Sequence, residues 1–232
     1  MTALAHAPFA GQETAPPTAR FRHVATALAL PGAFVLVLAS NVLYAVASTG
    51  NAGDTGTGAQ TIEFYREHTD ALRAATLLAM LGCLLAVPGL LAALRWVFPH
   101  KPRLGLWSVV LMVAGYISYF GIVTTNFDTV ALARSPLTAE EAGDILEHGA
   151  MAEPLALAFF ALFVVGNLLG TALLGLAVIL ARGLPTVAGV LVLGWPVGHA
   201  LNVFAGLGEW FAVGGGALEI AGFAWLAWRA RG

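Results

Sequence analysis

Six long apolar stretches divide the chain, and they constrain its fold more than any other feature. We place them at residues 27–48, 72–97, 104–125, 154–181, 184–207 and 211–228. Each is long enough to cross about 30 Å of hydrocarbon as a helix. Of the 232 residues, 59% are hydrophobic and only 10% are charged, whereas an average soluble domain carries about 25% charged residues. The sequence therefore predicts an all-α, polytopic membrane protein with six transmembrane helices.

The cationic residues are distributed unevenly between the two sides of such a bundle. Eight of the 11 Lys and Arg residues fall on the side of the two termini: Arg20, Arg22, Arg95, Lys101, Arg103, Arg182, Arg229 and Arg231. The other side holds Arg66, Arg73 and Arg134, together with eleven of the 13 acids. Because cytoplasmic loops are enriched in Lys and Arg, we expect both termini in the cytoplasm. The Arg-rich, Lys-poor composition is typical of a high-GC bacterium, so the expected location is a bacterial cytoplasmic membrane.

The chain divides into a tail and a bundle. Residues 1–26 are rich in Ala, Pro and Thr and lack apolar periodicity, so we expect a disordered cytoplasmic tail. Residues 27–232 form the six-helix bundle. Its longest external connection is an acidic loop at 126–153.

A short helix is predicted within this acidic loop. Thr138 followed by Glu141 fits a capping box, in which each side chain bonds the other residue's backbone N–H. We therefore expect a helix from Ala139 to His148, with Ile145 and Leu146 turned toward the bundle. It would lie over the outer mouth of the bundle.

One family pattern is present in the first half of the chain. A Gly-rich loop is followed by the run from Gln60 to His68, which reads Gln-Thr-Ile-Glu-Phe-Tyr-Arg-Glu-His, and then by a Leu-rich span. This order resembles a group of uncharacterised six-helix membrane proteins common in actinobacteria. The resemblance implies the same bundle fold, and it carries over no catalytic residues.

Two ionisable side chains lie well inside apolar spans, and both belong to the last hairpin. His199 precedes Glu209 by ten residues, and Glu219 follows it by ten. With a tight turn around Glu209, two antiparallel helices bring these side chains to the same depth. An ionisable residue inside a membrane is a candidate functional residue because its burial costs several kcal/mol. We therefore expect a direct or one-water contact between His199 and a protonated Glu219.

This pair has two interpretations that the sequence leaves open. As a structural clasp, neutral Glu219 hydrogen-bonds neutral His199 and fixes the register of the hairpin. As a functional pair, Glu219 is a general acid with His199 as its partner, or both form a proton relay in a transport path. Trp195 shares a helical face with His199 by its i, i+4 spacing and could line the same pocket.

Other polar residues cluster toward the outer end of the predicted bundle. Asp128 is a third candidate for acid/base chemistry. The candidate binding residues are Asn41, Asn126, Glu153, Asn167, Trp195, Asn202 and Glu209. Polar residues gathered on one side indicate a cavity open to the outside, although ordinary polarity at the headgroup level explains most of them equally well.

The motifs of cofactor, metal and nucleic-acid proteins are missing. The sequence has no phosphate-binding Gly-rich motif, no haem attachment motif and no zinc-type His/Cys spacing, so we expect no cofactor, no metal and no nucleic-acid partner. The expected partners are the lipid bilayer, an apolar small-molecule ligand, and a second copy or another membrane subunit.

Three functions remain open from the sequence. The first is a small membrane enzyme whose outer-leaflet pocket does acid/base chemistry, an isomerisation or cyclisation, on a lipid-like or isoprenoid-like substrate. The second is a small transporter or channel-like protein that uses the same intramembrane pair. The third is a non-catalytic accessory or sensor subunit.

Overall fold

The computed structural model describes residues 17–49, 56–149 and 153–229, and within these ranges the regular secondary structure is helical. The helices are α1 (Pro17–Ser48), α2 (Gly58–Glu67), α3 (Thr69–Val97), α4 (Pro102–Ala133), α5 (Ala139–Glu147), α6 (Pro154–Leu180), α7 (Thr186–Val192), α8 (Gly194–Val203) and α9 (Glu209–Arg229). Six helical segments are long and apolar enough to cross a membrane, with α7 and α8 together forming one of them. The prediction of an all-α protein with six such spans is confirmed.

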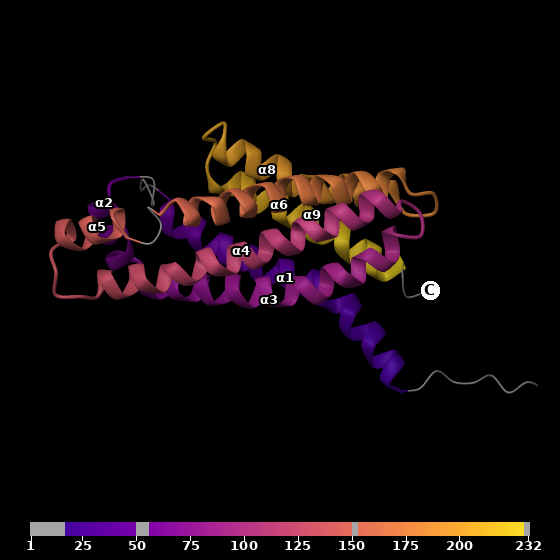
Figure 1. Ribbon diagram of the computed structural model, residues 1–232, viewed down its shortest axis with the longest axis horizontal. Helices are drawn as coiled ribbons and strands as arrows, with labels where there is room; N and C mark the ends of the chain where they lie inside the picture. Colours follow the sequence, from indigo (N-terminus) through magenta and orange to yellow (C-terminus); the bar gives the residue numbers. More distant parts are fainter. Residues whose placement is uncertain (1–16, 50–55, 150–152, 230–232) are drawn as a thin grey trace, which may run out of the picture.

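The spanning helices lie side by side and form one bundle (Figure 1). Helix α1 packs against α3 and α9, and α4 packs against α3 and α6. Helix α6 also contacts α7, while α9 contacts both α7 and α8. The short helices α2 and α5 pair with each other at one end of the bundle, which we call the cap end. We call the opposite end the basic end because the turns at 98–101 and 181–185 lie there, beside Arg95, Lys101, Arg103 and Arg182.

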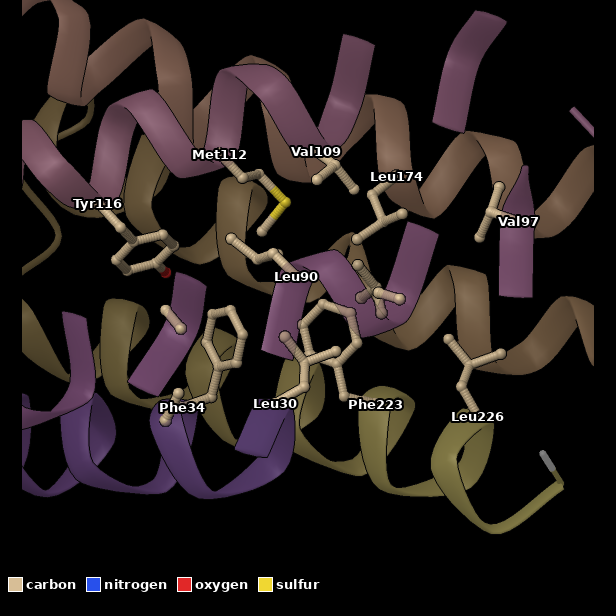
Figure 2. Packing of buried hydrophobic residues seen from close by; sticks show 14 of the residues in the cluster. Leu30, Phe34, Leu90, Val97, Val109, Met112, Tyr116, Leu174, Phe223 and Leu226 are labelled. Atoms are coloured by element: carbon tan, nitrogen blue, oxygen red, sulfur yellow. The ribbon is translucent and has the colours of Figure 1, made fainter. Parts of the chain in front are cut away.

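The interior of the bundle is apolar toward the basic end. Leu30, Leu90, Met112, Leu174 and Phe223 are almost fully buried there and belong to one cluster. Figure 2 shows these side chains filling the space between the helices, from Tyr116 to Val97 and Leu226. The half of the bundle at the basic end is therefore closed by packed hydrocarbon.

Small residues bring α4 and α6 into close contact. A Cβ atom on Gly166 would lie 2.6 Å from the carbonyl oxygen of Leu111, and one on Gly170 would lie 2.7 Å from the Met112 side chain. Only glycine permits such an approach between helices. The small-xxx-small spacing of Gly166 and Gly170 thus serves close helix packing.

Two helix boundaries differ from the sequence-based expectation. Helix α1 begins at Pro17, so residues 17–26 are helical instead of part of a disordered tail. Proline is suited to the first helical position because the N–H that it lacks has no helical partner there. The rest of the predicted tail, residues 1–16, lies outside the described residues. Helix α4 continues to Ala133, well into the expected 126–153 loop, because Val130 and Ala133 pack into an apolar cluster with α2 and α5.

Helices α2 and α5 each begin with a capping box. In α2, Thr57 and Gln60 exchange side-chain to backbone hydrogen bonds, and in α5 Thr138 and Glu141 do the same. The predicted capping box at Thr138 and the predicted short helix are therefore confirmed. Because each box bonds two otherwise free backbone N–H groups, helices of this length can begin at a defined residue.

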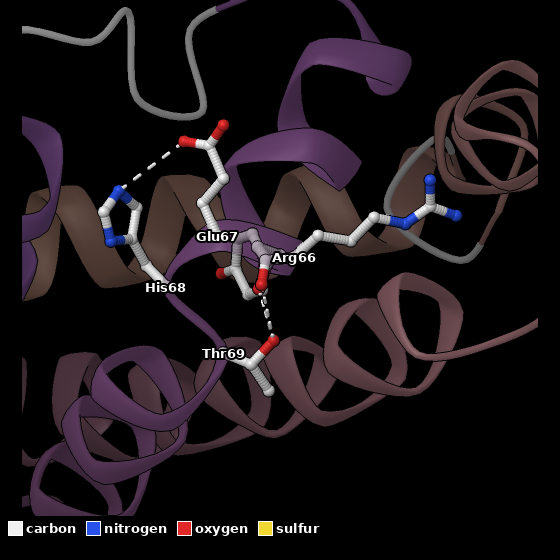
Figure 3. Close-up of polar contacts among 5 residues, drawn as sticks. Arg66, Glu67, His68 and Thr69 are labelled. Carbon is white, nitrogen blue, oxygen red and sulfur yellow. Dashed lines mark hydrogen bonds and ion pairs between the residues drawn. The ribbon is translucent and has the colours of Figure 1, made fainter.

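The cap is held together by close backbone contact and by side-chain hydrogen bonds to the backbone. Gly58 lies directly against Gly143, and the Glu147 carboxylate accepts a hydrogen bond from the Gly58 N–H. Arg66 donates to the carbonyl oxygens of Ala133 (3.0 Å) and Leu137 (2.7 Å). Figure 3 shows Arg66 extending from the end of α2, with the Thr69 hydroxyl bonded to the preceding turn. The cap is thus a compact unit attached to the end of α4.

The predicted orientation of α5 is wrong for one residue. Ala142 is fully buried and Leu146 is packed against the cap cluster, but Ile145 is 49% exposed. The contact between Gly58 and Gly143 determines which face of α5 is covered. Helix α5 therefore rests on α2 instead of lying with Ile145 against the mouth of the bundle.

Candidate functional site

The turn of the last hairpin does not lie at Glu209. Helix α8 ends at Val203 and α9 begins at Glu209, so the turn comprises residues 204–208. Gly206 and Gly208 adopt φ values of 64° and 96° there, a region that glycine enters without steric cost.

The register of the hairpin follows from its glycine contacts. A Cβ atom on Gly194 would touch Leu218, and one on Gly222 would lie 2.7 Å from the carbonyl oxygen of Ala188. His199 lies four residues before the end of α8, whereas Glu219 lies ten residues after the start of α9. This difference of about six residues separates their depths by about 9 Å. The prediction that His199 and Glu219 lie at one depth is therefore wrong.

The expected direct contact between this pair is also not formed. Among the described residues, neither oxygen of the Glu219 carboxyl group has a hydrogen-bond partner, and Nδ1 of His199 has none. The structural clasp that we considered from the sequence is therefore excluded as a direct hydrogen bond. Glu219 needs another explanation, because its side chain is only 1% exposed.

The residues near Glu219 include aromatic side chains and glycine. Phe223, one turn further along α9, stacks on Phe34 with ring centroids 4.8 Å apart. The Phe34 ring in turn meets Tyr116 edge-on, with centroids 5.7 Å apart. Gly222 lets α9 approach α7 closely on the neighbouring face. The carboxyl group therefore lies in the interior of the bundle beside aromatic rings.

His199 and Trp195 form a stack on α8. Their ring centroids are 4.7 Å apart and the rings are nearly parallel, with an interplanar angle of 17°. Trp195 is buried at 5% exposure, and His199 is half-buried. The prediction that the two side chains share one face of this helix is confirmed.

Helix α6 contributes two further buried polar side chains. Asn167 and Thr171 are 1% and 0% exposed. The Asn167 amide nitrogen donates to the carbonyl oxygen of Phe163 at 3.0 Å. Its Oδ1 atom and the Thr171 hydroxyl have no hydrogen-bond partner within the described ranges. Sequence reasoning named Asn167 but missed Thr171, although its i+4 spacing from Asn167 places both on one helical face.

We call Asn167, Thr171, His199 and Glu219 the interior polar set. Contacts of Gly175 with Gly189 and Leu193 fix the relative depths of α6 and α7. Together with the hairpin register, they place Glu219 near the level of Thr171 and His199 near the level of Asn167. The interior polar set thus occupies two levels of the bundle, and Glu219 and Thr171 are on the one nearer the basic end.

The remaining predicted site residues are spread toward the cap end. Asp128 and Glu153 are exposed. Asp128 follows Tyr116 on α4 by twelve residues, or about 18 Å, so the structure does not bring it to Glu219. Half-buried positions are occupied by Asn41, Asn126, Asn202 and Glu209. The structure therefore brings Trp195 and His199 into contact and buries Asn167 and Glu219 in the interior, while the other candidates are exposed or half-buried.

No metal-binding geometry is found among the described residues. Within these ranges no three His, Cys, Asp or Glu side chains gather closely enough to hold a metal ion.

Comparison of the chain with known proteins assigns no function to the site. No protein family, no curated protein and no solved structure matches this chain. Its function is therefore argued from the interior polar set alone.

Proposed function

We propose that this protein is a small integral membrane enzyme that carries out acid/base chemistry on a lipid-like or isoprenoid-like substrate, an isomerisation or a cyclisation. The observation that carries the proposal is the carboxyl group of Glu219, which is 1% exposed and has no hydrogen-bond partner. A carboxylate is too costly at such a position without a partner. The group is therefore a neutral carboxylic acid, ready to donate its proton.

The aromatic neighbours suit a cationic intermediate. Glu219 would protonate one carbon of a substrate alkene, which leaves a carbocation and the Glu219 carboxylate. Phe223 follows Glu219 by one helical turn and stacks on Phe34, which meets Tyr116 edge-on, and aromatic faces attract cations. Loss of a proton from another carbon to the carboxylate then restores the acid and forms an isomer. Attack by a second alkene of the same chain before that loss gives a ring.

His199 has a supporting place in this scheme. It lies about 9 Å from Glu219 along the bundle axis, which is too far for direct proton transfer. Its stack on Trp195 instead shapes the wall of the site toward the cap end. We assign it a positioning role.

The packing of the basic end favours an enzyme over a transporter. Leu30, Leu90, Leu174 and Phe223 are buried in one cluster on that side of the site. A transport path would need polar groups on both sides of the intramembrane acid. The break between α7 and α8 is the one feature that a transporter would also use.

We also propose an orientation in the membrane. Arg95, Lys101, Arg103 and Arg182 lie at the basic end, and we place this end and both termini in the cytoplasm of a bacterium. The cap is then external, and the interior polar set opens toward the outer leaflet. A Lys101→Cys variant in intact cells should resist membrane-impermeant thiol reagents. Labelling of this cysteine from outside would contradict the orientation.

The enzyme proposal is tested in cells that lack the gene. These cells are complemented with the wild type or with Glu219→Gln, and their lipids are separated by chromatography and mass spectrometry. Isomerisation and cyclisation conserve mass, so we expect a lipid pair of equal mass and different retention that interconverts only with the wild type. Identical lipid profiles for both would contradict the proposal. A loss of proton flux into vesicles with Glu219→Gln would favour the transporter instead.

A further inference from the structure

Cationic side chains lie at the basic end of the bundle without a counter-charge. Exposed or, for the one lysine, half-buried, they are Arg95, Lys101, Arg103, Arg182 and Arg229. Of the acidic residues that the structure describes, Glu219 is the nearest to them along the chain, and it precedes Arg229 by ten residues, or about 15 Å on α9. The ion pairs found within the described ranges belong to His68 and His148 in the cap. The cations of the basic end therefore have no ion pair among the described residues.

The two turns at the basic end touch each other. A Cβ atom on Gly183 would lie 4.0 Å from the Cε1 atom of His100. Gly183 directly follows Arg182, and His100 directly precedes Lys101. The contact between the turns therefore brings one cationic residue from each turn to the same part of the surface.

The register between α4 and α6 adds Arg103 to this place. Gly170 packs against Met112, since a Cβ atom on this glycine would lie 2.7 Å from the Met112 side chain. From that contact Arg103 lies nine residues toward the basic end on α4, and Leu180 lies ten residues toward it on α6. These separations are about 14 and 15 Å. Arg103 is therefore level with the end of α6, which Arg182 follows by two residues.

Two of the cations continue apolar faces that the bundle turns outward. On α4, Arg103 shares a face with Trp107 and Val110 by its i, i+4 and i+7 spacing, and both are exposed. On α3, Arg95 follows exposed Leu91 by one turn. Since α3 and α4 are long and apolar enough to cross a membrane, we expect these faces to meet hydrocarbon. A cation one turn beyond them, next to a tryptophan, is then at the level of the lipid headgroups.

This placement indicates which anion the cations meet. An arginine binds a phosphate through two parallel hydrogen bonds, and a lysine binds it as a point charge. At the headgroup level of a membrane, the phosphates are those of the lipids, and basic residues near the surface favour lipids of net negative charge. An acyl chain attached to such a headgroup would run along the exposed face of Trp107 and Val110. A soluble phosphate would leave this apolar face without a role.

We propose that the basic end binds an anionic phospholipid, with its phosphate at Arg103 and Arg182 and an acyl chain along the α4 face of Trp107 and Val110. Lys101 contributes further positive charge at the contact between the turns. The inference goes beyond the proposed function and does not rest on it, because acid/base chemistry in the interior needs none of these cations.

The test is a competition between two lipids for the full chain in detergent. Phosphatidylglycerol and phosphatidylcholine with the same acyl chains are added in equal amounts, and native mass spectrometry identifies the first lipid that stays bound. A single Lys or Arg near the surface favours an anionic lipid by about fivefold. We therefore expect the wild type to prefer phosphatidylglycerol at least about fivefold. Equal binding of both lipids would overturn the proposal, and this result requires no variant to fold.

Two matched double variants locate the site. Arg103→Gln with Arg182→Gln should bind the two lipids equally. Arg73→Gln with Arg134→Gln removes the same charge from exposed positions at the cap end and should keep the wild-type preference. An equal loss in both double variants would mean that net charge alone attracts the lipid, and it would overturn the site.

Two further measurements separate this site from other sources of phosphate and from the interior. Glycerophosphoglycerol, which is the same headgroup without acyl chains, should not displace phosphatidylglycerol at equal concentration, because it lacks the contact with the α4 face. Displacement by this soluble phosphate would overturn the placement of the acyl chain. Glu219→Gln should keep the wild-type preference whether or not it changes lipids in cells. Loss of the preference in this variant would overturn the assignment of the lipid to the basic end.

Discussion

The cap and the interior polar set differ in how far their polar groups are hydrogen-bonded. In the cap, Glu141, Glu147 and Arg66 all hydrogen-bond to backbone groups. Among the cap residues that the structure describes, only Nε2 of His68 is buried without a hydrogen bond, and it faces the Glu67 carboxylate at 3.9 Å. In the interior, Asn167 Oδ1, Thr171 Oγ1 and both oxygens of Glu219 have no partner in the protein, although their side chains are almost fully buried.

We interpret this difference as a separation between residues that stabilise the fold and residues that the proposed function uses. Each buried polar atom without a partner costs about 1–3 kcal/mol, so selection for stability alone would replace these side chains with apolar ones. The cap shows that this sequence encodes well-formed polar contacts where they hold the fold. The unpartnered groups at the centre of the bundle therefore support the role in binding or catalysis that we propose for them.

The largest effect is expected from Glu219→Gln. The amide keeps the size of the side chain but cannot deliver a proton, so activity should fall by about 10²–10⁴-fold. The thermal unfolding midpoint in detergent should stay close to that of the wild type. A variant that keeps full turnover would remove the acid from the mechanism.

A second variant of Glu219 tests the comparison between the cap and the interior polar set through the free energy of unfolding. Glu219→Leu removes an unpartnered polar group, so we expect the free energy of unfolding to stay equal or rise by about 1–2 kcal/mol. Chemical denaturation in mixed micelles measures it. A loss of more than about 1 kcal/mol would mean that Glu219 stabilises the fold after all.

The next largest effect should come from the cap. Gly143 lies against the backbone of Gly58 and Ala59, so Gly143→Val forces α2 and α5 apart at a cost of about 1–3 kcal/mol. Hydrogen exchange should rise in both cap helices while activity persists. Gly121→Ala is the matched control, because a Cβ atom there meets nothing within 4 Å. Loss of activity with Gly143→Val would mean that the cap and the interior polar set act together.

Much of this architecture could be predicted from the sequence. The six spans follow from apolar length, and the capping box of α5 follows from Thr138 and Glu141. Both signals are local: each depends on a few neighbouring residues and on one helix. The burial of Glu219 was predictable for the same reason, since it lies inside a long apolar run with Gly215 and Gly222 around it.

The relation between helices was not predictable in this way. The depth of His199 relative to Glu219 depends on where the turn lies. From the sequence we placed the centre of this turn at Glu209, but Glu209 is the first residue of α9. The exposure of Ile145 depends on the contact between Gly58 and Gly143, which are far apart in the chain. For Thr171, the sequence offered only its i+4 spacing from Asn167 on α6. Each error therefore concerns packing between helices, which a single helical pattern does not encode.

A smaller effect is expected at the start of α5. The Thr138 hydroxyl accepts the Glu141 N–H at 3.2 Å, so Thr138→Ala should destabilise the helix by about 1 kcal/mol. Local hydrogen exchange in residues 139–147 measures this loss, and Thr138→Ser should restore most of it. Activity should not change. A defect in turnover would break the separation between a structural cap and a functional interior.

The smallest effect is a pH dependence confined to the end of α5. The Asp144 carbonyl oxygen, 2.9 Å from Nδ1 of His148, and then the Asp144 carboxylate raise the pKa of His148 above its ordinary value of 6.5. A raised folded-state pKa means that the protonated ring stabilises the helix terminus, where a positive charge is favoured. This contribution is complete below pH 6.5 and is lost as the pH rises through the folded-state pKa.

Protection factors of the α5 amides, corrected for intrinsic exchange, should therefore be higher below pH 6.5 than well above it. His148→Gln should remove this difference, because its side chain does not titrate. The amides of α9 around Glu219 should show no such step tied to His148. Protection of α5 that is the same at both pH values would show that the His148 contact does not stabilise the cap.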